Sequence, residues 1–515
     1  MSSKKEKEKE EKEPKEQVKK IYKEAQNCID KNDNIKAISL YNTMFDILRN
    51  NNISIKGIYH NELSKLYQKE NCFQAAAEEL IEYVKTIPQG TSNYGVAINE
   101  IGVCYFNIKQ YEEALKYFTI VLQMAQIPDI YNNIACCYRH LNKYDLCEKS
   151  LLRSLELDSR NNSTKYSLTE IYYLTKEYKK AIYYFTLSQT KESDYIYNAS
   201  FPYLALKNFK LGFKLYEKRL DNNKINAQTN LKERVDINGI DYWDGETLCK
   251  NVLVIYEQGI GDNIQYFRFL IDVIKKFPSI TFTFLYNKVV GNMFNITKYN
   301  NLKTIKDIKP YDFHLYDYKV YTMSLPYKLG VTNIIPNKIN YININQEKNL
   351  YWKNKLSALK QFKIGIVYNG LLESYLEKYI PLEDFKILLD LPVDLICIQR
   401  KSEIEKDINK LSFKDKINYY DIDTEEPFID TIAILQNIDL LITIDTYIVH
   451  LAGVLGVKTW LLLGKVSEWR WSTDSSSYWY NSVDIMRGKE NLKLKNILPE
   501  VRQRLDKHLD IYKLD

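Results

Sequence analysis

The sequence has little net charge of one sign, no C-x-x-C cysteine pair and no long uninterrupted apolar run. A net charge of +6 over 515 residues gives no reason to expect binding to nucleic acid or to a membrane surface. Without a C-x-x-C pair, the eight cysteines are interpreted as small buried residues in a reducing compartment, not as metal ligands or disulfides.

The longest apolar stretch, Leu440 to Gly464, is interrupted by Asp445, His450 and Lys458, which a membrane-spanning segment would not carry together. Residues 4–16 are charged at every position except Pro14, with six lysines and six glutamates. This pattern argues against a signal peptide and predicts a charged tail over residues 1–16, either disordered or a frayed helix. We expect a soluble, cytoplasmic protein without a transmembrane segment.

A chain of this length is too long for one compact core, and its first part repeats. Six times, at intervals of 31 to 39 residues, a small residue is followed twelve positions later by another. The pairs are Ala25 and Ala37, Ser64 and Ala76, Gly102 and Ala114, Ala135 and Cys147, Thr169 and Ala181, and Ser200 and Gly212. Small residues let two antiparallel helices approach closely, and several such pairs must stack to bury their apolar faces.

The segment Ile101 to Leu122, "IGVCYFNIKQYEEALKYFTIVL", resembles tetratricopeptide repeats, and the resemblance covers residues 17–222. It implies an α solenoid whose concave groove binds a protein or peptide. A spacer or a dimerisation surface is the alternative, because the consensus positions do not specify a ligand.

After residue 222 the pattern changes to short apolar runs separated by helical stretches. The expected strands are Val252 to Tyr256, Phe282 to Tyr286, Lys363 to Tyr368, Val393 to Ile398, Leu440 to Ile444 and Thr459 to Leu463. Continuous apolar runs of this kind indicate parallel strands covered by helices on both faces, hence an α/β fold. We expect a linker over residues 223–249, one α/β half over 250–345, and a second over 346–515 that ends in a helical tail.

Ligands of such sheets bind beyond the carboxyl ends of the strands. In "VLVIYEQGIGDNIQYF", Gly259 and Gly261 follow the first strand, where the missing side chains let a ligand approach backbone N–H groups. Asp262 stands at the start of the next helix, where a carboxylate often caps the helix. The segment "NIDLLITIDTYIVHLAG" places Asp445 and Thr446 directly after another strand, and His450 one helical turn later.

Together these two stretches resemble glycosyltransferases of the heptosyltransferase family, especially members linked to tetratricopeptide repeats. Further matches, in order along the chain, are "YWDGETL" from Tyr242, "YTMSLPYKLGVTNIIPN" from Tyr321, "KYIPLEDF" from Lys378, "CIQR" from Cys397 and "EWRW" from Glu468. The resemblance implies a glycosyltransferase-B fold of two Rossmann-like halves, and an inverting transfer from a nucleotide sugar without a metal or other cofactor.

The resemblance also assigns roles to individual residues. Asp262 is the expected catalytic base, which removes the proton of the acceptor hydroxyl. The residues expected to bind substrate are Gln258, Gly259, Gly261, Lys378, Gln399, Asp445, Thr446 and His450. Among them, Lys378 and the helix start near Thr446 would stabilise the departing diphosphate.

Each assignment has a structural alternative. Asp262, Asp445 and Thr446 could cap helices, His450 could be a buried core histidine, Lys378 a solvated lysine and Gln399 a structural amide. The aromatic cluster Trp469, Trp471, Tyr478, Trp479 and Tyr480 is typical of core or lid packing more than of a sugar platform.

The chain also departs from the family that it resembles at Tyr447, Leu371, Leu372 and Tyr379, where that family carries small or polar residues. A repeat scaffold with a degenerate transferase-like half, or a regulator that binds without turnover, therefore stays open.

Overall fold

The computed structural model describes residues 2–221, 239–286, 290, 293–336, 340–370, 378–488 and 493–512. It divides into two compact units, Met1–Ile171 and Tyr172–Asp515. Within the described residues, no helix combines the length and apolar character needed to cross a membrane. Leu371 and Leu372, two of the departures noted above, lie outside the described residues.

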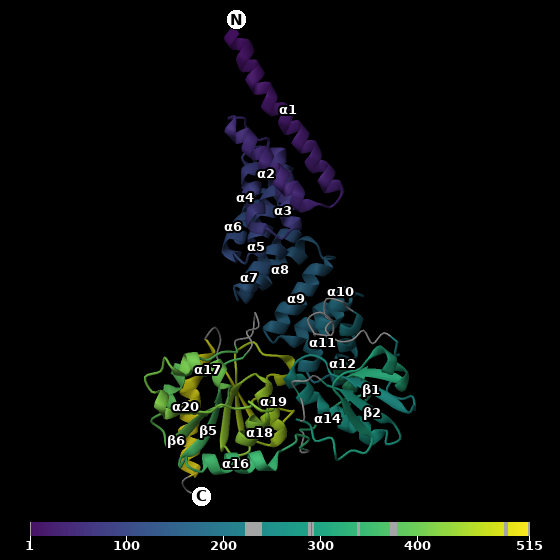
Figure 1. The fold of residues 1–515 in the computed structure, drawn as a ribbon, viewed down its shortest axis with the longest axis vertical. Helices are drawn as coiled ribbons and strands as arrows, with labels where there is room; N and C mark the ends of the chain where they lie inside the picture. The colour runs from purple at the N-terminus through teal and green to yellow at the C-terminus, as the bar shows by residue number, and fades with distance from the viewer. Residues whose placement is uncertain are drawn as a thin grey trace. The chain divides into compact units, whose positions relative to one another are not determined.

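The first unit is built from consecutive helices that pack in pairs (Figure 1). They are α1 (Ser2–Asp30), α2 (Asn34–Asn50), α3 (Gly57–Lys69), α4 (Phe73–Val84), α5 (Ser92–Asn107), α6 (Tyr111–Met124), α7 (Pro128–His140), α8 (Tyr144–Leu157) and α9 (Asn162–Leu174), with the border between units inside α9. The second unit opens with α10 (Tyr178–Ser188), α11 (Ser193–Ala205), α12 (Phe209–Tyr216) and the 3₁₀ turn η1 (Glu217–Asp221). Residues 2–16, expected as a tail or frayed helix, belong to α1.

The same tight turn joins the two helices of every pair. Its middle residue has a left-handed backbone, with φ between 57° and 65°. These residues are Asn32, Asn71, Lys109, Asn142, Lys176 and Lys207. Each lies seven positions after the first small residue of its pair and five before the second, so the turn fixes the spacing of twelve.

All twelve small residues are buried, which confirms the prediction that the helices approach each other closely there. A Cβ atom at Gly102 would lie 2.6 Å from the ring of Phe118, and one at Gly212 would lie 2.6 Å from Cγ of Leu204. At these two positions nothing larger than glycine fits without displacing the neighbouring side chain. The first part of the chain is therefore a solenoid of helical repeats of the tetratricopeptide type.

The rest of the second unit contains two separate parallel sheets (Figure 1). The first has the strand order β3-β2-β1-β4. Its elements are β1 (Asn251–Ile255), α14 (Ile260–Lys276), β2 (Thr281–Leu285), β3 (Leu302–Ile305), η3 (Pro310–Leu315), β4 (Tyr318–Tyr321), η4 (Thr322–Ser324) and α15 (Leu325–Lys328).

The second sheet has the order β10-β9-β8-β5-β6-β7. Its elements are α16 (Gln346–Leu356), β5 (Phe362–Val367), η5 (Leu382–Leu388), β6 (Val393–Cys397), α17 (Lys401–Ile408), η6 (Lys414–Lys416), β7 (Ile417–Tyr419), α18 (Ile429–Leu435), β8 (Leu440–Ile444), α19 (Tyr447–Leu455), β9 (Thr459–Leu463), η7 (Trp469–Trp471), β10 (Val483–Arg487), η8 (Leu494–Ile497) and α20 (Leu498–Tyr512). Read in chain order this is 3-2-1-4-5-6, the order of a doubly wound α/β sheet. The prediction of parallel strands in an α/β fold is confirmed.

The last repeat shares its core with the two sheets. The ring of Phe213 in α12 lies 6.4 Å from those of Tyr266 and Phe269 in α14, and 6.3 Å from that of Trp469. The sequence pattern separates repeats from sheets at residue 222, but packing separates the chain at residue 171, because apolar and aromatic residues of α10, α11 and α12 belong to the same core as the two sheets. The last repeat is therefore structurally part of the α/β unit.

The end of the expected linker also packs on the first sheet. Trp243 is fully buried, its backbone N–H donates to the carbonyl of Lys319 at 2.8 Å, and its indole N–H donates to the carbonyl of Thr247 at 3.0 Å. The motif "YWDGETL" thus extends the α/β half beyond β4.

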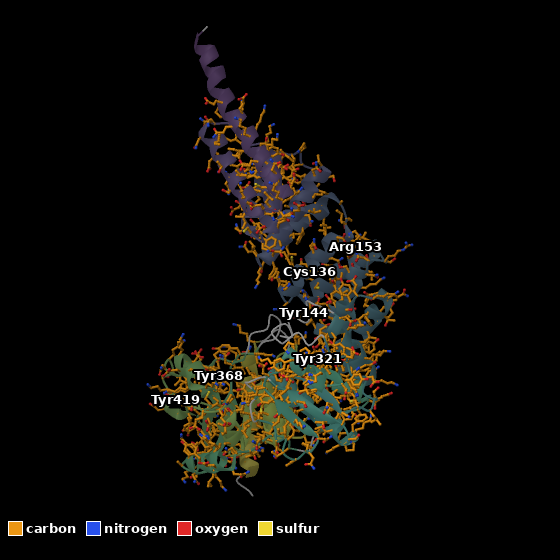
Figure 2. All side chains as sticks on the ribbon, turned by 45° about the vertical axis from the view of Figure 1, so that its right-hand side comes forward. Cys136, Tyr144, Arg153, Tyr321, Tyr368 and Tyr419 are labelled. Carbon is orange, nitrogen blue, oxygen red and sulfur yellow. The ribbon has the colours of Figure 1, made fainter. Side chains whose placement is uncertain are left out.

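None of the eight cysteines forms a disulfide. Cys28, Cys104, Cys137, Cys147 and Cys397 are buried, whereas Cys72 is exposed. Cys136 in α7, labelled in Figure 2, is half-buried, and burial raises the pKa of its thiol. Most of these thiols act as small packing residues.

Candidate functional site

Hydrogen bonds from the side chains of Asp262 and Asn263 hold the loop after β1 in place. The Asp262 carboxylate accepts a hydrogen bond from the Gly259 backbone N–H at 3.1 Å, so it caps α14. The Asn263 amide donates to the Glu257 and Gly259 carbonyls, and its oxygen accepts from the Thr322 hydroxyl at 3.0 Å. These bonds fix the position of Asp262 relative to the first sheet.

Asp262 also faces a cation from η7, which follows β9 of the second sheet. Nη1 of Arg470 lies 2.6 Å from its Oδ1. Nε of Arg470 lies 2.9 Å from Oε2 of Glu468. Glu468 in turn lies 3.6 Å from Nζ of Lys378, which is 3.7 Å from Oδ2 of Asp445.

These five side chains form a row of alternating charge, which we call the charged row: Asp262, Arg470, Glu468, Lys378 and Asp445. They are only 11% to 24% exposed. Asp262 follows β1, Lys378 follows β5, Asp445 follows β8, and Glu468 and Arg470 follow β9. The row therefore joins the carboxyl ends of strands from both sheets, where α/β folds bind ligands.

Burial dominates the electrostatics at Asp445. It raises the pKa of the Asp445 carboxyl to about 6, with a further contribution from Glu468, while Lys378 and Arg470 oppose the rise. Burial alone would lower the pKa of Arg470, but the Asp262 and Glu468 carboxylates outweigh it and hold this pKa above the ordinary value. One end of the row can thus take up a proton in mildly acid solution.

This raised pKa predicts a pH-dependent stability. Asp445 ionises less readily in the folded chain than in the unfolded chain, and this difference lowers the free energy of unfolding. The loss is absent below about pH 4, grows between pH 4 and 6, and is complete above pH 6. Asp445→Asn removes this loss, so relative to wild type the variant should gain on the order of 3 kcal/mol as pH rises through this window. Urea unfolding followed by tryptophan fluorescence at a series of pH values measures the gain. A difference between variant and wild type that stays constant from pH 4 to 7 would contradict the assignment.

Thr446, the N-cap residue of α19, and His450, in the first part of that helix, lie next to the row. The Thr446 hydroxyl accepts from the Ile448 N–H at 3.3 Å and caps the helix. His450 is buried, its Nδ1 lies 3.1 Å from the Tyr480 hydroxyl, and its ring stacks on Trp471 at 5.3 Å. Burial, with Arg470 and Lys378 nearby, lowers the His450 pKa well below its ordinary value, so the ring is neutral at pH 7.

The two α/β halves are in contact at Gly261. A Cβ atom there would lie 2.8 Å from Cδ2 of His450 and 3.3 Å from Cα of Tyr447. The start of α14 therefore lies against the start of α19, and the small size of Gly261 is required for this packing.

Two predicted site residues make their polar contacts within the protein. The Gln258 amide bonds to the Tyr216 hydroxyl of the last repeat. The Gln399 oxygen accepts from the backbone N–H groups of Tyr368 and Asn369, and its amide group donates to the Asn369 carbonyl. The structure thus brings together Asp262, Lys378, Asp445, Thr446 and His450, and directs Gln258 and Gln399 to structural partners.

Sequence reasoning assigned no role to Glu468 or Arg470. Both belong to the quoted "EWRW" segment, in which two charged residues alternate with two tryptophans of the aromatic cluster, and this alternation is the signal that the sequence offers. Trp469, Trp471, Trp479 and Tyr480 are buried, which agrees with core packing.

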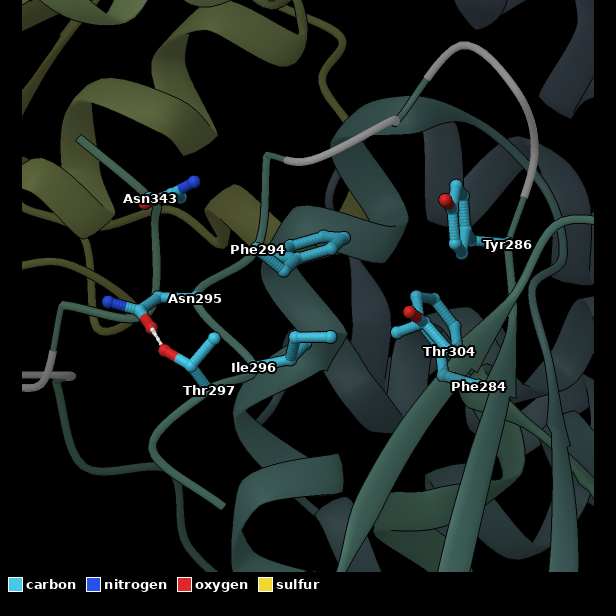
Figure 3. Close-up of a pocket in the computed structure, with 8 residues that line it drawn as sticks. All are labelled: Phe284, Tyr286, Phe294, Asn295, Ile296, Thr297, Thr304 and Asn343. Atoms are coloured by element: carbon cyan, nitrogen blue, oxygen red, sulfur yellow. Dashed lines mark hydrogen bonds between the residues drawn. The ribbon is translucent and has the colours of Figure 1, made fainter. Parts of the chain in front are cut away.

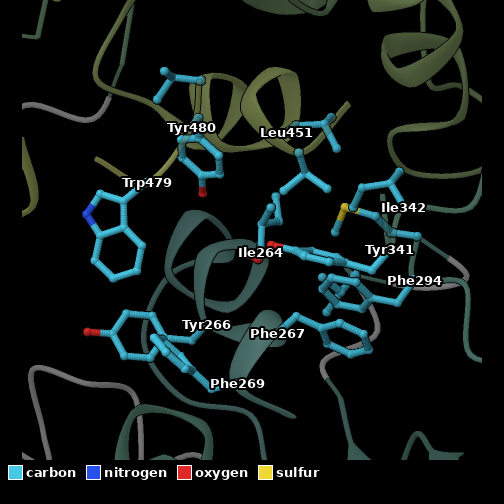
Figure 4. Packing of buried hydrophobic residues seen from close by; sticks show 14 of the residues in the cluster. Ile264, Tyr266, Phe267, Phe269, Phe294, Tyr341, Ile342, Leu451, Trp479 and Tyr480 are labelled. Atoms are coloured by element: carbon cyan, nitrogen blue, oxygen red, sulfur yellow. Dashed lines mark hydrogen bonds between the residues drawn. The ribbon is translucent and has the colours of Figure 1, made fainter. Parts of the chain in front are cut away.

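The same core surrounds α14 (Figure 4). Tyr266 and Phe269 lie 6.1 and 6.3 Å from Trp479, and Phe267 stacks on Phe294 at 4.0 Å. Residues 264–269, which follow the glycine loop, are therefore held by aromatic side chains from both halves.

A separate pocket of about 280 Å³ lies beside β2 and β3 (Figure 3). Its apolar wall comes from Phe284, Tyr286, Phe294 and Ile296, and its polar groups from Asn295, Thr297, Thr304 and Asn343. Phe284, Tyr286 and Thr304 lie at the carboxyl ends of their strands, at the same edge of the sheet as the glycine loop. Its volume is slightly below the range of roughly 300–1,000 Å³ that is typical of small-molecule sites.

Among the described residues, no three His, Cys, Asp or Glu side chains gather closely enough to hold a metal ion. Comparison of the chain with models of protein families found no match, and comparison with curated proteins found none either.

Solved structures give matches to helical repeat proteins. MamA from Desulfovibrio magneticus is 16% identical, with a TM-score of 0.29 over 33% of this chain and 91% of that chain. YrrB, described as a TPR protein with an unusual peptide-binding site, is 17% identical, with a TM-score of 0.27 over 35% of this chain and 92% of that chain. A tetratricopeptide repeat protein from Parabacteroides merdae is 13% identical, with a TM-score of 0.35 over 42% of this chain and 88% of that chain. The chain is similar to each of these proteins over less than half of its own length.

Proposed function

We propose that the chain is a glycosyltransferase with a glycosyltransferase-B fold, which moves a sugar from a nucleotide sugar to a hydroxyl acceptor. The observation that carries the proposal is the charged row. It links Asp262 of one α/β half to Asp445 of the other, at the carboxyl ends of strands in both sheets. Two facing halves with acidic residues at their junction are what the resemblance to heptosyltransferases implies.

The proposed reaction is an inverting displacement without a metal. The acceptor oxygen forms a bond to the anomeric carbon as the bond from that carbon to the diphosphate breaks on the opposite face. Asp262 takes the proton of the acceptor hydroxyl. Lys378 and the N-terminus of α19 stabilise the charge of the departing nucleoside diphosphate, and Asp445 accepts hydrogen bonds from sugar hydroxyls.

The helical repeats serve recognition in this proposal. A solenoid of this kind offers an extended surface for a protein or peptide, which is either the acceptor or a partner that delivers it. The pocket beside β2 and β3 lies at the edge of the first sheet that carries Asp262, and is a second place where an acceptor group could bind.

A non-catalytic scaffold is the second candidate, and specific contacts favour it. Both cations of the charged row already lie against protein carboxylates, and Gln258 and Gln399 bond to the protein itself. In a scaffold the repeats would bind a partner and the α/β halves would bind no nucleotide sugar.

Thermal unfolding with a panel of nucleoside diphosphates and their sugars separates the two candidates. A ligand at a hundred times its dissociation constant contributes about 2.7 kcal/mol, so at least one member of the panel should raise the melting temperature. Lys378→Gln should weaken that shift. An unchanged melting temperature with the entire panel would favour the scaffold.

A further inference from the structure

The last repeat contacts the loop that carries Asp262 through two side chains, Tyr216 and Arg219. The Tyr216 hydroxyl accepts from Nε2 of Gln258 at 2.8 Å and lies 3.2 Å from its Oε1. Tyr216 ends α12 and is only 3% exposed. Gln258 begins the turn that follows β1, so the repeat holds the side chain at the entrance of the loop.

The backbone at Gln258 needs such a partner. Its φ of 59° lies in the left-handed region, which residues other than glycine rarely adopt. A side chain fixed at both amide atoms holds the residue in this conformation, and Gly259, next in sequence, donates its N–H to Asp262. The position of Asp262 therefore depends on the conformation of Gln258.

Arg219 fixes the preceding residue. Its guanidinium binds both carboxylate oxygens of Glu257, at 3.1 and 2.7 Å, and neither side chain is exposed. Arg219 also donates to the Ser324 hydroxyl at 2.9 Å, and Glu257 accepts from the Met323 N–H at 2.8 Å. The ion pair is thus anchored in the repeat at one end and in the first sheet at the other.

We propose that Tyr216 and Arg219 are positioning residues, which hold residues 257–259 so that Asp262 faces Arg470. The last repeat then contributes to the geometry of the site and does not merely lie next to it. Loop order does not depend on the function proposed above, whereas the expected effect on turnover rests on it.

Hydrogen exchange of the full chain tests the proposal directly. In Tyr216→Phe, which removes only the hydroxyl, exchange of the amides in residues 257–261 should rise roughly five- to tenfold, because one buried hydrogen bond is lost. Arg219→Lys, which cannot bind the carboxylate in two places, should raise it further. The matched control is Tyr144→Phe, which removes a tyrosine hydroxyl that donates to an asparagine side chain at 2.9 Å in another repeat, and it should leave this loop unchanged.

Turnover of a nucleotide sugar is the second readout. In Tyr216→Phe, kcat should fall about fivefold while KM for the donor changes less than twofold and the melting temperature stays close to that of wild type. Faster loop exchange in both variants supports the positioning role even if wild type turns over no donor, in which case the proposed function fails alone. Unchanged exchange of residues 257–261 in both folded variants would overturn the positioning role.

Discussion

Replacing Asp262 by asparagine is expected to reduce sugar transfer roughly 10²- to 10⁴-fold, the usual contribution of a general base. The amide oxygen of asparagine can still accept the Gly259 N–H, so the cap on α14 is kept. The variant loses the basic carboxylate and the charge that faces Arg470. The effect should therefore appear in kcat, with the affinity for the nucleotide sugar nearly unchanged.

The matched control is Asp312→Asn. Asp312 accepts the Lys309 N–H at 3.2 Å, three residues back, as Asp262 accepts the Gly259 N–H, but it caps η3 outside the charged row. Steady-state turnover of both variants, with a donor identified by thermal shift, separates the loss of a base from the loss of a cap. Wild-type turnover in Asp262→Asn would show that this carboxylate is only a cap and an ion-pair partner.

Arg219→Met is expected to lower the free energy of unfolding of the α/β unit by about 3–5 kcal/mol, because it leaves the buried Glu257 carboxylate without its cation. Burial already raises the pKa of Glu257, and the Arg219 charge opposes that rise. Urea unfolding followed by tryptophan fluorescence measures the loss. All six tryptophans belong to the second unit, so the signal reports on that unit alone.

Two further variants make this result interpretable. Adding Glu257→Leu to Arg219→Met removes the uncompensated charge and should recover part of the loss. Lys218→Met, one residue away, breaks an exposed ion pair with Asp221 and should cost at most about 1 kcal/mol. A loss in Arg219→Met no larger than that in Lys218→Met would contradict a stabilising role for the buried pair.

The repeats could be predicted because their signal is local. The paired helices need a small side chain seven residues before the left-handed turn residue and another five residues after it. This fixed spacing can be found in the sequence alone. The border at residue 171 could not be predicted in this way. The border depends on which side chains the rings of Phe209 and Phe213 pack against, and the repeat pattern does not indicate those partners.

The central strands could be predicted, whereas the edge strands could not. The four strands absent from the sequence prediction are β3, β4, β7 and β10, and they form the edges of the two sheets. An edge strand is paired on one side only, so segments such as "LKTI" in β3 carry polar residues and lack a continuous apolar run. The strands with neighbours on both sides carry the continuous apolar runs from which strands are predicted. They are β1, β2, β5, β6, β8 and β9.

Part of the charged row was also predictable. Asp262 and Asp445 follow predicted strands, Lys378 matches a motif of the family that the chain resembles, and the three side chains lie in one row. The pairing of Asp262 with Arg470 spans 208 positions and depends on how the two sheets meet, so no local spacing indicates it. The contact of Gln258 with Tyr216 links residues 42 positions apart, so the sequence does not indicate it.

A crystal structure of the full chain with the nucleotide sugar that gives the largest thermal shift tests the central claim most directly. The diphosphate is expected within hydrogen-bonding distance of Lys378 Nζ and the start of α19, with the anomeric carbon on the side of Asp262. A nucleotide bound away from the charged row, with Asp262, Glu468 and Asp445 unchanged in their ion pairs, would contradict it.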